Sequence, residues 1–350
     1  MIVVNNEDLR KKIGYLGMAV SKNVASKQSE KMIKFDCVDG VIYAYTSDGV
    51  NNIRVEIGTS DKDFYAIVDH ATFSTFIKSC DGDITLDTKD KFMHIKSSNV
   101  KCKIPTYNHE LKRDNKAIPD PTGNYTYDNT LSEQIDLKLI KSMLNPDHII
   151  DVYSKIYFGN SIMVSDTDNV IMKNVRVFSK DILLDLSSVE ILAMLNNVEY
   201  TFINDNKVTR LCIKSDELYA TMVVTDNDNN DFQYTDFLEL FETVSGSSVL
   251  LDTSVLVKAM NASALFKVNP IIVFNPKGIF VQIDAFEFIY KISDVACEDR
   301  KFELSNNLVK MITTLGKDVT IYYTNEDLIK CEADNIQEIL SVVEVKTIGK

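Results

Sequence analysis

The chain has 350 residues, of which 45% are hydrophobic, and a formal net charge of −13. Its length is enough for two or three domains, and it contains no apolar run of 18 residues, which excludes a membrane-spanning helix. The acidic balance argues against a protein that simply coats nucleic acid, because a basic patch is the usual footprint of such proteins.

The first third of the chain alternates helices and strands. Apolar residues recur at helical spacing between Leu9 and Val20, which predicts a first helix. Strands follow, and the Asp39-Gly40 dipeptide between two of them predicts a hairpin. Asp69 is the expected N-cap of a second helix, and further strands end the segment. The expected strands are 32–37, 41–45, 53–57, 64–68, 83–88, 91–97 and 99–104.

The same order of elements recurs twice more. Helices at about 136–145 and 253–266 each precede a group of strands, and second helices follow the expected caps Ser187 and Ser305. The three expected caps are spaced by 118 residues. A period this long indicates repeated domains rather than a solenoid. The expected strands are 152–158, 161–165, 169–177, 181–186, 199–204, 208–214 and 217–224, then 271–275, 278–284, 286–292, 300–304, 318–323, 327–333 and 338–345.

Short turns between strands favour antiparallel sheets, and helices must then cover one face of these sheets. We therefore predict an α+β fold of three repeated domains, each with two helices on one face of its antiparallel sheets. Residues 111–131 are an expected linker because Pro119, Pro121 and Gly123 lie there among charged residues, and residues 225–248 are a second, acidic connector. The predicted domains are residues 1–110, 132–240 and 241–350.

Positive charge is concentrated in the predicted helices. Just past their caps they hold eleven basic residues and one acidic residue, Glu190, whereas the whole chain is acidic. Because a helix normally mixes both signs on its solvated face, this pattern predicts a basic helical face that suits contact with a polyanion. The eleven residues are Arg10, Lys11, Lys12, Lys22, Lys78, Lys138, Lys141, Lys258, Lys267, Lys310 and Lys317.

The residues indicate no catalytic or metal chemistry. Phosphate-loop, dinucleotide-binding, nucleophile-elbow and His-Glu-x-x-His motifs are missing from the sequence. The six cysteines form no C-x-x-C pair and no histidine joins them at metal spacing. We interpret Asp166 and Asp168 as turn residues. We expect reduced thiols in a cytoplasmic protein, with no enzymatic activity, no cofactor and no metal site.

The threefold order resembles the bacterial type of DNA polymerase sliding clamp over essentially the whole chain. The most specific local match is the run Ile42–Asp48, an apolar strand ending in a Thr and Asp turn, followed by the apolar strand Ile53–Ile57. Ile104-Pro105 resembles the apolar-Pro step that ends the first clamp domain. The abundance of Asn, Asp, Lys and Ile with no Trp suits an AT-rich bacterial or phage genome.

The resemblance implies a closed ring of two chains joined head to tail. Helices line its hole, and sheets form its outer wall. Such a homodimer encircles double-stranded DNA without sequence preference, tethers a DNA polymerase and needs a clamp loader to open it. This implies residence in a bacterial cytoplasm or an infected host cell.

The resemblance also implies an apolar cleft between domains two and three, where polymerase and loader peptides dock. By position it comprises Val152, Ser165, Thr167, Val170, Phe237, Leu238, Val343 and Val345. The sequence departs from the family here, because Asp168-Asn169 replaces a common His-Arg pair and the chain ends in Lys346-Thr-Ile-Gly-Lys350. Partner peptides are therefore expected to differ, or the cleft to be reshaped.

Two alternatives stay open from the sequence. One is a clamp-like processivity factor that does not form a ring and binds DNA by charge alone, and the other is a repeated protein-interaction adaptor that does not encircle DNA. The net charge of −13 favours topological retention over binding by charge, because binding by charge collapses with salt.

Overall fold

The computed structural model describes residues 1–107, 125–166, 168–205, 208–227, 232–244, 246–303, 305–323, 328–333 and 337–342. The chain forms two compact units. Unit 1 comprises residues 1–135 and 187–225, and unit 2 comprises residues 136–186 and 226–350. The second expected domain is thus shared between the units. No helix within the described ranges is long and apolar enough to cross a membrane.

Unit 1 contains two antiparallel sheets. The smaller one has the order β1-β6-β7-β8, and the larger one runs β5-β2-β3-β4-β16-β15-β14-β9. The larger sheet joins strands of the first and second repeats, because β4 pairs with β16 and places Arg54 opposite Tyr219. The strands are β1 (Ile2–Val4), β2 (Met32–Val38), β3 (Val41–Ser47), β4 (Asn51–Thr59), β5 (Tyr65–Asp69), β6 (Ile84–Lys89), β7 (Phe92–Lys96), β8 (Lys101–Pro105), β9 (Thr126–Asp128), β14 (Val198–Asp205), β15 (Val208–Lys214) and β16 (Tyr219–Asp226).

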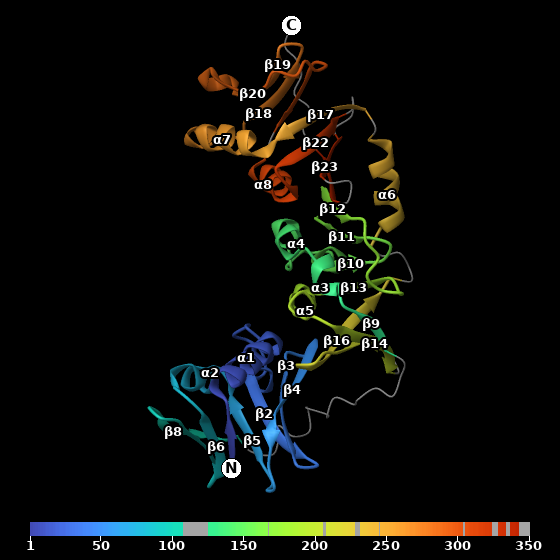
Figure 1. The fold of residues 1–350 in the computed structure, drawn as a ribbon. Coiled ribbons are helices and arrows are strands. Elements are labelled where there is room, and N and C mark those ends of the chain that lie inside the picture. Colours follow the sequence, from blue (N-terminus) through green and yellow to red (C-terminus); the bar gives the residue numbers. More distant parts are fainter. Residues whose placement is uncertain are drawn as a thin grey trace. The chain divides into compact units, whose positions relative to one another are not determined.

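The helices of the first repeat cover both of its sheets. α1 and α2 lie against each other, above the strands in Figure 1. The apolar residues predicted to face inward are buried, including Leu9 and Ile13 of α1 and Phe73 and Ile77 of α2. The helical elements of unit 1 are α1 (Asn6–Leu16), η1 (Gly17–Ala19), η2 (Gln28–Lys31), α2 (His70–Ser79), α3 (Leu131–Gln134) and nearly all of α5 (Leu186–Leu192). β9 and the start of α3 fall within the expected linker.

Two of the three expected helix caps are confirmed. The Asp69 carboxylate accepts from the backbone N–H of Thr72 at 2.7 Å, and the Ser305 hydroxyl accepts from that of Leu308 at 3.0 Å. The expectation for Ser187 is wrong, because α5 begins at Leu186, which leaves Asp185 in the position before the helix. The Ser187 hydroxyl instead accepts a hydrogen bond from the Asn51 side chain at 2.9 Å.

Unit 2 repeats the arrangement of unit 1. Its larger antiparallel sheet runs β17-β22-β23-β24-β12-β11-β10-β13, and its smaller one runs β20-β19-β18-β21. Here β24 of the third repeat pairs with β12 of the second repeat. The strands are β10 (Ile156–Phe158), β11 (Ile162–Ser165), β12 (Asn169–Lys173), β13 (Ile182–Leu184), β17 (Ser247–Asp252), β18 (Ile271–Asn275), β19 (Gly278–Ile283), β20 (Phe288–Ser293), β21 (Arg300–Glu303), β22 (Asp318–Tyr323), β23 (Leu328–Ala333) and β24 (Gln337–Val342).

Unit 2 carries helices on both sides of its larger sheet. α4 packs against α8, which packs against α7, and Figure 1 shows α6 on the opposite side of the strands from α4 and α8. α6 lies in the expected second connector and spans the expected domain boundary at 240/241. The helical elements are α4 (Leu137–Met143), η4 (Asp151–Ser154), α6 (Tyr234–Thr243), α7 (Thr253–Ser263), η5 (Ala264–Phe266), η6 (Asp284–Phe286) and α8 (Asn306–Leu315).

His70, the first residue of α2, is enclosed against α1. A Cβ added at Gly17 would lie 3.2 Å from the imidazole ring. Burial lowers the pKa of His70 below its usual value, although a hydrogen bond to the Ile13 backbone and the Asp69 carboxylate act in the opposite direction. The folded state therefore favours the neutral form of His70.

We predict that His70 makes the folded state sensitive to acid. Because its pKa is lower when folded, the unfolded chain binds the proton first, and stability is lost as the pH falls below the unfolded value of about 6.5. His70→Asn should therefore lose less free energy of unfolding than the parent chain between about pH 7.5 and about pH 5.5. Urea denaturation at both pH values measures this, and equal losses in the two proteins would contradict it.

Candidate nucleic-acid interface and partner groove

Arg10 joins the two helices of the first repeat. Its Nη2 donates to the backbone carbonyls of Lys78 at 2.9 Å and Cys80 at 2.7 Å. The last carbonyls of a helix have no partner inside it, and a cation there also complements the helix dipole. Arg10 was predicted to face DNA, and the structure gives its guanidinium a structural contact at the end of α2.

We expect Arg10→Met to lower the free energy of unfolding by about 1–2 kcal/mol, because hydrogen bonds from a charged donor to these carbonyls are lost. Lys78→Met is the matched control: Lys78 is exposed on the same pair of helices, so its effect should stay within about 0.5 kcal/mol. Urea denaturation compares the two variants. Equal effects would show that the Arg10 contacts do not stabilise the fold.

Lys11 and Tyr15 of α1 both bind Glu217, in the turn between β15 and β16. The hydrogen bond from Lys11 is the largest effect that holds the pKa of Glu217 below its usual value. Burial raises the pKa of Tyr15, and the hydrogen bond to Glu217 raises it further. Lys12 pairs with Asp8 at 2.6 Å. Two of the basic residues expected to face DNA therefore carry charges that are compensated within unit 1.

The other eight expected DNA contacts are exposed lysines: Lys22, Lys78, Lys138, Lys141, Lys258, Lys267, Lys310 and Lys317. In unit 2, Lys138, Lys310 and Lys258 project from the adjacent helices α4, α8 and α7. Within the described residues, no ion pair neutralises these three side chains. Hydrogen bonds from Ser254 lower the pKa of Asp252, and Lys317 and Lys258 add to this. Lys138, Lys258 and Lys310, which were predicted to face DNA, thus project from one layer of helices in unit 2.

Four expected partner-cleft residues meet in one hydrophobic cluster of unit 2. Val170 and Phe237 are 3% and 7% exposed within it, and Val152 and Leu238 pack against it. Ser165 is fully buried in β11. Thr167, Val343 and Val345 lie outside the described residues. We call this buried cluster the aromatic cluster; it also includes Tyr153, Tyr157, Met163, Met172 and Leu183.

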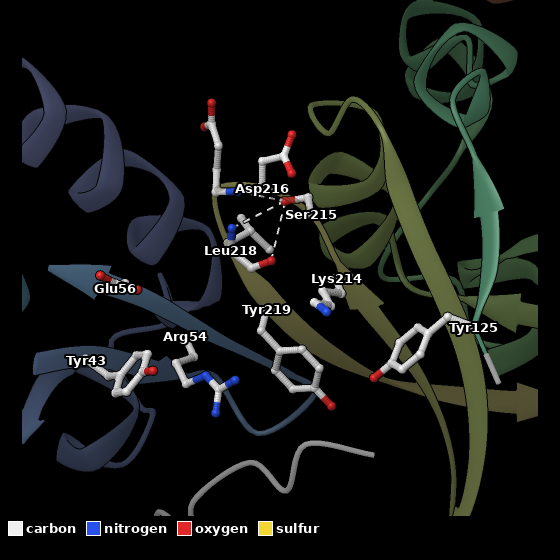
Figure 2. A pocket seen from close by; sticks show the side chains of 10 residues that line it. Tyr43, Arg54, Glu56, Tyr125, Lys214, Ser215, Asp216, Leu218 and Tyr219 are labelled. Carbon is white, nitrogen blue, oxygen red and sulfur yellow. Dashed lines mark hydrogen bonds between the residues drawn. The ribbon is translucent and has the colours of Figure 1, made fainter. Parts of the chain in front are cut away.

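A polar pocket of unit 1 lies where strands of the first two repeats meet. This open pocket has a volume of about 400 Å³, and Figure 2 shows Arg54 between the rings of Tyr43 and Tyr219, with Lys214 and Tyr125 nearby. The Arg54 guanidinium carbon lies 5.1 Å and 4.9 Å from the two ring centroids, a cation–π arrangement. These contacts span the β4–β16 pairing, so the cavity belongs to a joint between repeats.

The aspartates that we interpreted as turn residues stabilise a turn. Asp166 accepts hydrogen bonds from the backbone N–H of Asn169 at 2.8 Å and of Asp168 at 3.2 Å. Asp48 accepts in the same way from Asn51 at 2.7 Å in the first repeat. Among the described residues, no group of three or more His, Cys, Asp or Glu side chains could hold a metal ion.

Sequence reasoning missed three features of these surfaces. Glu217 was part of an expected strand, and no local pattern pairs it with Lys11, which is 206 residues away. Phe237 and Phe241 lie four residues apart in the connector, but the sequence analysis did not predict the helix α6 there. Tyr157 lay in an expected strand, and its stacking with Phe232 at 5.3 Å depends on the fold of the connector.

The fold belongs to the DNA-clamp class. The Helicobacter pylori β clamp bound to a DNA ligase peptide matches with a TM-score of 0.75 and 14% sequence identity, covering 98% of this chain and 99% of that chain. The β subunits of DNA polymerase III from Thermotoga maritima and Streptococcus pneumoniae both match with a TM-score of 0.79, at 13% and 12% identity, covering 98% of each chain.

The expected resemblance to bacterial sliding clamps is therefore confirmed for the fold. The α+β class with antiparallel sheets and repeated helices is confirmed with it. No family model and no curated protein matches the sequence. The likeness is thus carried by the backbone, at sequence identities that establish the fold alone.

Proposed function

We propose that this chain is a DNA sliding clamp. Two copies close head to tail into a ring, the ring encircles double-stranded DNA, and it tethers a DNA polymerase to its template. The chain has no catalytic role in this account. It acts where DNA is replicated, in a bacterial cytoplasm or an infected host cell, and it requires a loader that opens the ring.

The main support for the proposal is the regular way in which strands of successive repeats pair with each other. β4 and β12 are the third strands of the groups β2-β3-β4 and β10-β11-β12, whereas β16 and β24 end the groups β14-β15-β16 and β22-β23-β24. The pairs β4–β16 and β12–β24 therefore each join the third strand of one repeat to the last strand of the next repeat. The rule leaves over the last strand of the first repeat, β8, and the third strand of the third repeat, β20.

β8 and β20 are both open sheet edges within the described residues. β8 pairs only with β7, and β20 pairs only with β19. An open edge offers unpaired backbone groups to another strand. Pairing β8 of one copy with β20 of a second copy completes the rule and turns both four-stranded sheets into one eight-stranded sheet. Applied to both copies, this pairing closes a ring.

The surfaces around the two edges are complementary. On the side of β20, the Phe266 ring packs at a tilt against Phe286 and Phe288, with centroids 4.7 Å and 5.4 Å away, and Leu265 and Ile289 are 85% and 66% exposed. Such a contiguous apolar patch is typical of a protein interface. Exposed carboxylates flank the strand at Asp284 and Glu287, while Asp294 pairs with Lys291 of β20 itself. β8 and the end of β7 carry exposed Lys96, Lys101 and Lys103.

The ring itself is tested by molar mass. Light scattering at micromolar concentration should give twice the chain mass of 39.6 kDa. A persistent monomer would favour a clamp-like factor that binds DNA by charge alone, and three chains would require another closure.

The exposed helix lysines are proposed to contact DNA phosphates weakly. Replacement of both Lys138 and Lys310 by alanine should reduce the magnitude of the negative slope of log affinity against log salt by roughly 2, because each phosphate contact contributes about −0.9. Fluorescence anisotropy with short duplex DNA at low salt measures this slope. Lys277→Ala, an exposed lysine in the turn between β18 and β19, is the control and should leave the slope unchanged. If the double variant has the same slope as the parent chain, DNA does not contact Lys138 and Lys310.

The surface beside the aromatic cluster is the proposed binding site for peptides of the polymerase and the loader. Two observations support this: four expected cleft residues meet there, and the similarly folded H. pylori clamp is bound to a DNA ligase peptide.

A further inference from the structure

The smaller sheet of unit 1 has a basic outward face. In β6 and β7 the inward side chains, such as Leu86 and Ile95, are fully buried, and alternate residues point the other way. The outward side chains of β6, β7 and β8 line an open hollow of about 480 Å³. The ionisable ones among them are Asp87, Lys89, His94, Lys96, Lys101 and Lys103.

The positive charge of this face is not neutralised by its own strands. Its one carboxylate, Asp87, pairs with the ammonium group of Met1 at 3.3 Å. Among the residues that the structure describes, no carboxylate pairs with Lys96, Lys101 or Lys103. The whole chain has a net charge of −13, so this sheet face differs in sign from most of the protein and attracts anionic groups.

Two of the lysines lie directly opposite each other. The register of β7 and β8 places Lys96 against Lys101. Like charges at such a pair of positions destabilise the sheet, so an anion bound between the two ammonium groups would stabilise the folded chain. Lys101 and Lys103 are two residues apart on one strand, which separates them by about 7 Å. An extended peptide with carboxylates at alternate positions has the same spacing.

The next outward positions along these strands are apolar. Phe92 lies opposite Pro105, two residues beyond Lys103 on β8. A peptide that follows β8 thus meets two basic positions and then an apolar one. The matching pattern on the peptide is acidic, acidic and apolar at every second residue.

A short acidic peptide fits this face better than a nucleic acid does. Single-stranded nucleic acids stack their bases on aromatic rings, but the Lys103 ammonium group covers the Phe92 ring, 4.7 Å from its centroid. The basic face is also short, because exposed Asp81 and Asp83 lie just before β6. These carboxylates repel a long polyanion that extends beyond the face.

We propose that the outward face of β6, β7 and β8 binds a short, extended acidic segment of a partner protein, with two carboxylates and an apolar side chain at alternate positions. This site lies in unit 1, apart from the surface beside the aromatic cluster, and it does not rest on the proposed function. The ring-closing edge of β8 lies in the plane of the sheet, whereas these side chains stand roughly perpendicular to it. Closing the ring therefore leaves the face open.

The test uses a fluorescein-labelled peptide of sequence Ser-Glu-Ser-Glu-Ser-Leu-Ser, titrated with the full chain at low salt and followed by fluorescence anisotropy. Lys96→Glu/Lys101→Glu should bind the peptide at least about ten-fold more weakly, because like charges then face each other. Lys27→Glu/Lys62→Glu is the matched control. It changes the net charge equally at exposed positions before η2 and β5 and should bind like the parent chain. A peptide with both glutamates replaced by glutamine should not bind.

Equal peptide binding by the parent chain and the Lys96→Glu/Lys101→Glu variant, or no binding by the parent chain, would overturn the proposal. Tighter binding of a labelled oligothymidylate of equal length would also overturn it and assign the face to nucleic acid. If the charge-reversed variant does not fold, lysine acetylation of the parent chain decides. Excess peptide should protect Lys96 and Lys101 but not Lys27, and unchanged acetylation would refute the proposal.

The Leu265→Asp chain separates this face from ring closure, because that substitution alters the apolar patch beside β20. The parent chain and Leu265→Asp should bind the peptide equally, whether or not the parent chain forms a ring in light scattering. Peptide binding by the Leu265→Asp chain alone would mean that the lysines are buried between two chains, and it would overturn the proposal without affecting the ring.

Discussion

Leu265→Asp is expected to separate the ring into single chains. Leu265 is 85% exposed and is adjacent in sequence to Phe266, whose ring packs against Phe286 and Phe288, so a second copy that covers this patch would bury it. Replacing a buried leucine removes about 1.5–3 kcal/mol of apolar burial, and an unpaired carboxylate in the interface costs more. We expect the dissociation constant of the two-chain ring to rise by at least about 100-fold.

Sedimentation velocity over a range of concentrations measures this change. The free energy of unfolding of the single chain should stay nearly unchanged, because the residue is exposed there. Leu250→Asp, at a 61% exposed position of β17, is the matched control and should leave the ring intact. If both variants remain dimeric, the surface around Leu265 and Phe266 is not part of the interface between the two chains.

Asn51→Leu is expected to destabilise unit 1 strongly. Asn51 is fully buried, and its amide donates to Ser187 at 2.9 Å and to Asp48 at 3.2 Å, while its carbonyl accepts from Ser188 at 2.7 Å. Leucine would leave the fully buried Ser188 hydroxyl without its partner, and a buried unsatisfied group costs about 1–3 kcal/mol. With the other bonds lost, we expect a decrease of about 3–4 kcal/mol in the free energy of unfolding.

The control for this prediction is the neighbouring Asn52→Leu. Asn52 is half-buried, and its side chain donates to Thr221 at 3.1 Å, so its replacement should cost about 1 kcal/mol. Urea denaturation followed by circular dichroism gives both values. Similar losses for the two variants would mean that Asn51 does not fasten β4 to α5.

The elements that sequence could predict depend on local patterns. Apolar spacing placed Leu9 and Ile13 in the core, and the Asp69 and Ser305 caps were correct because a cap needs only the side chain and the next turn of backbone. Ser187 misled the prediction for a physical reason. Its hydroxyl is used by Asn51, 136 residues away, and no local pattern reveals such a partner.

The candidate sites were only partly predictable. Composition placed lysines on the helices, and eight of the eleven predicted basic residues are exposed lysines outside the contacts of Arg10, Lys11 and Lys12. The contacts of Arg10 and Lys11 involve residues more than 60 positions away, beyond the reach of periodicity. Likewise, no local pattern shows which strands of different repeats pair with each other. The free edges β8 and β20 could therefore not be recognised before the fold was known.

The retention of the protein on circular against linear DNA tests the central claim of a closed ring most directly. After loading onto nicked circular DNA, the protein should stay bound when salt is raised, and it should be released when one cut linearises the circle, because a ring slides off free ends. Equal loss from circular and linear DNA at each salt concentration would contradict encirclement and show that the protein is held by charge alone.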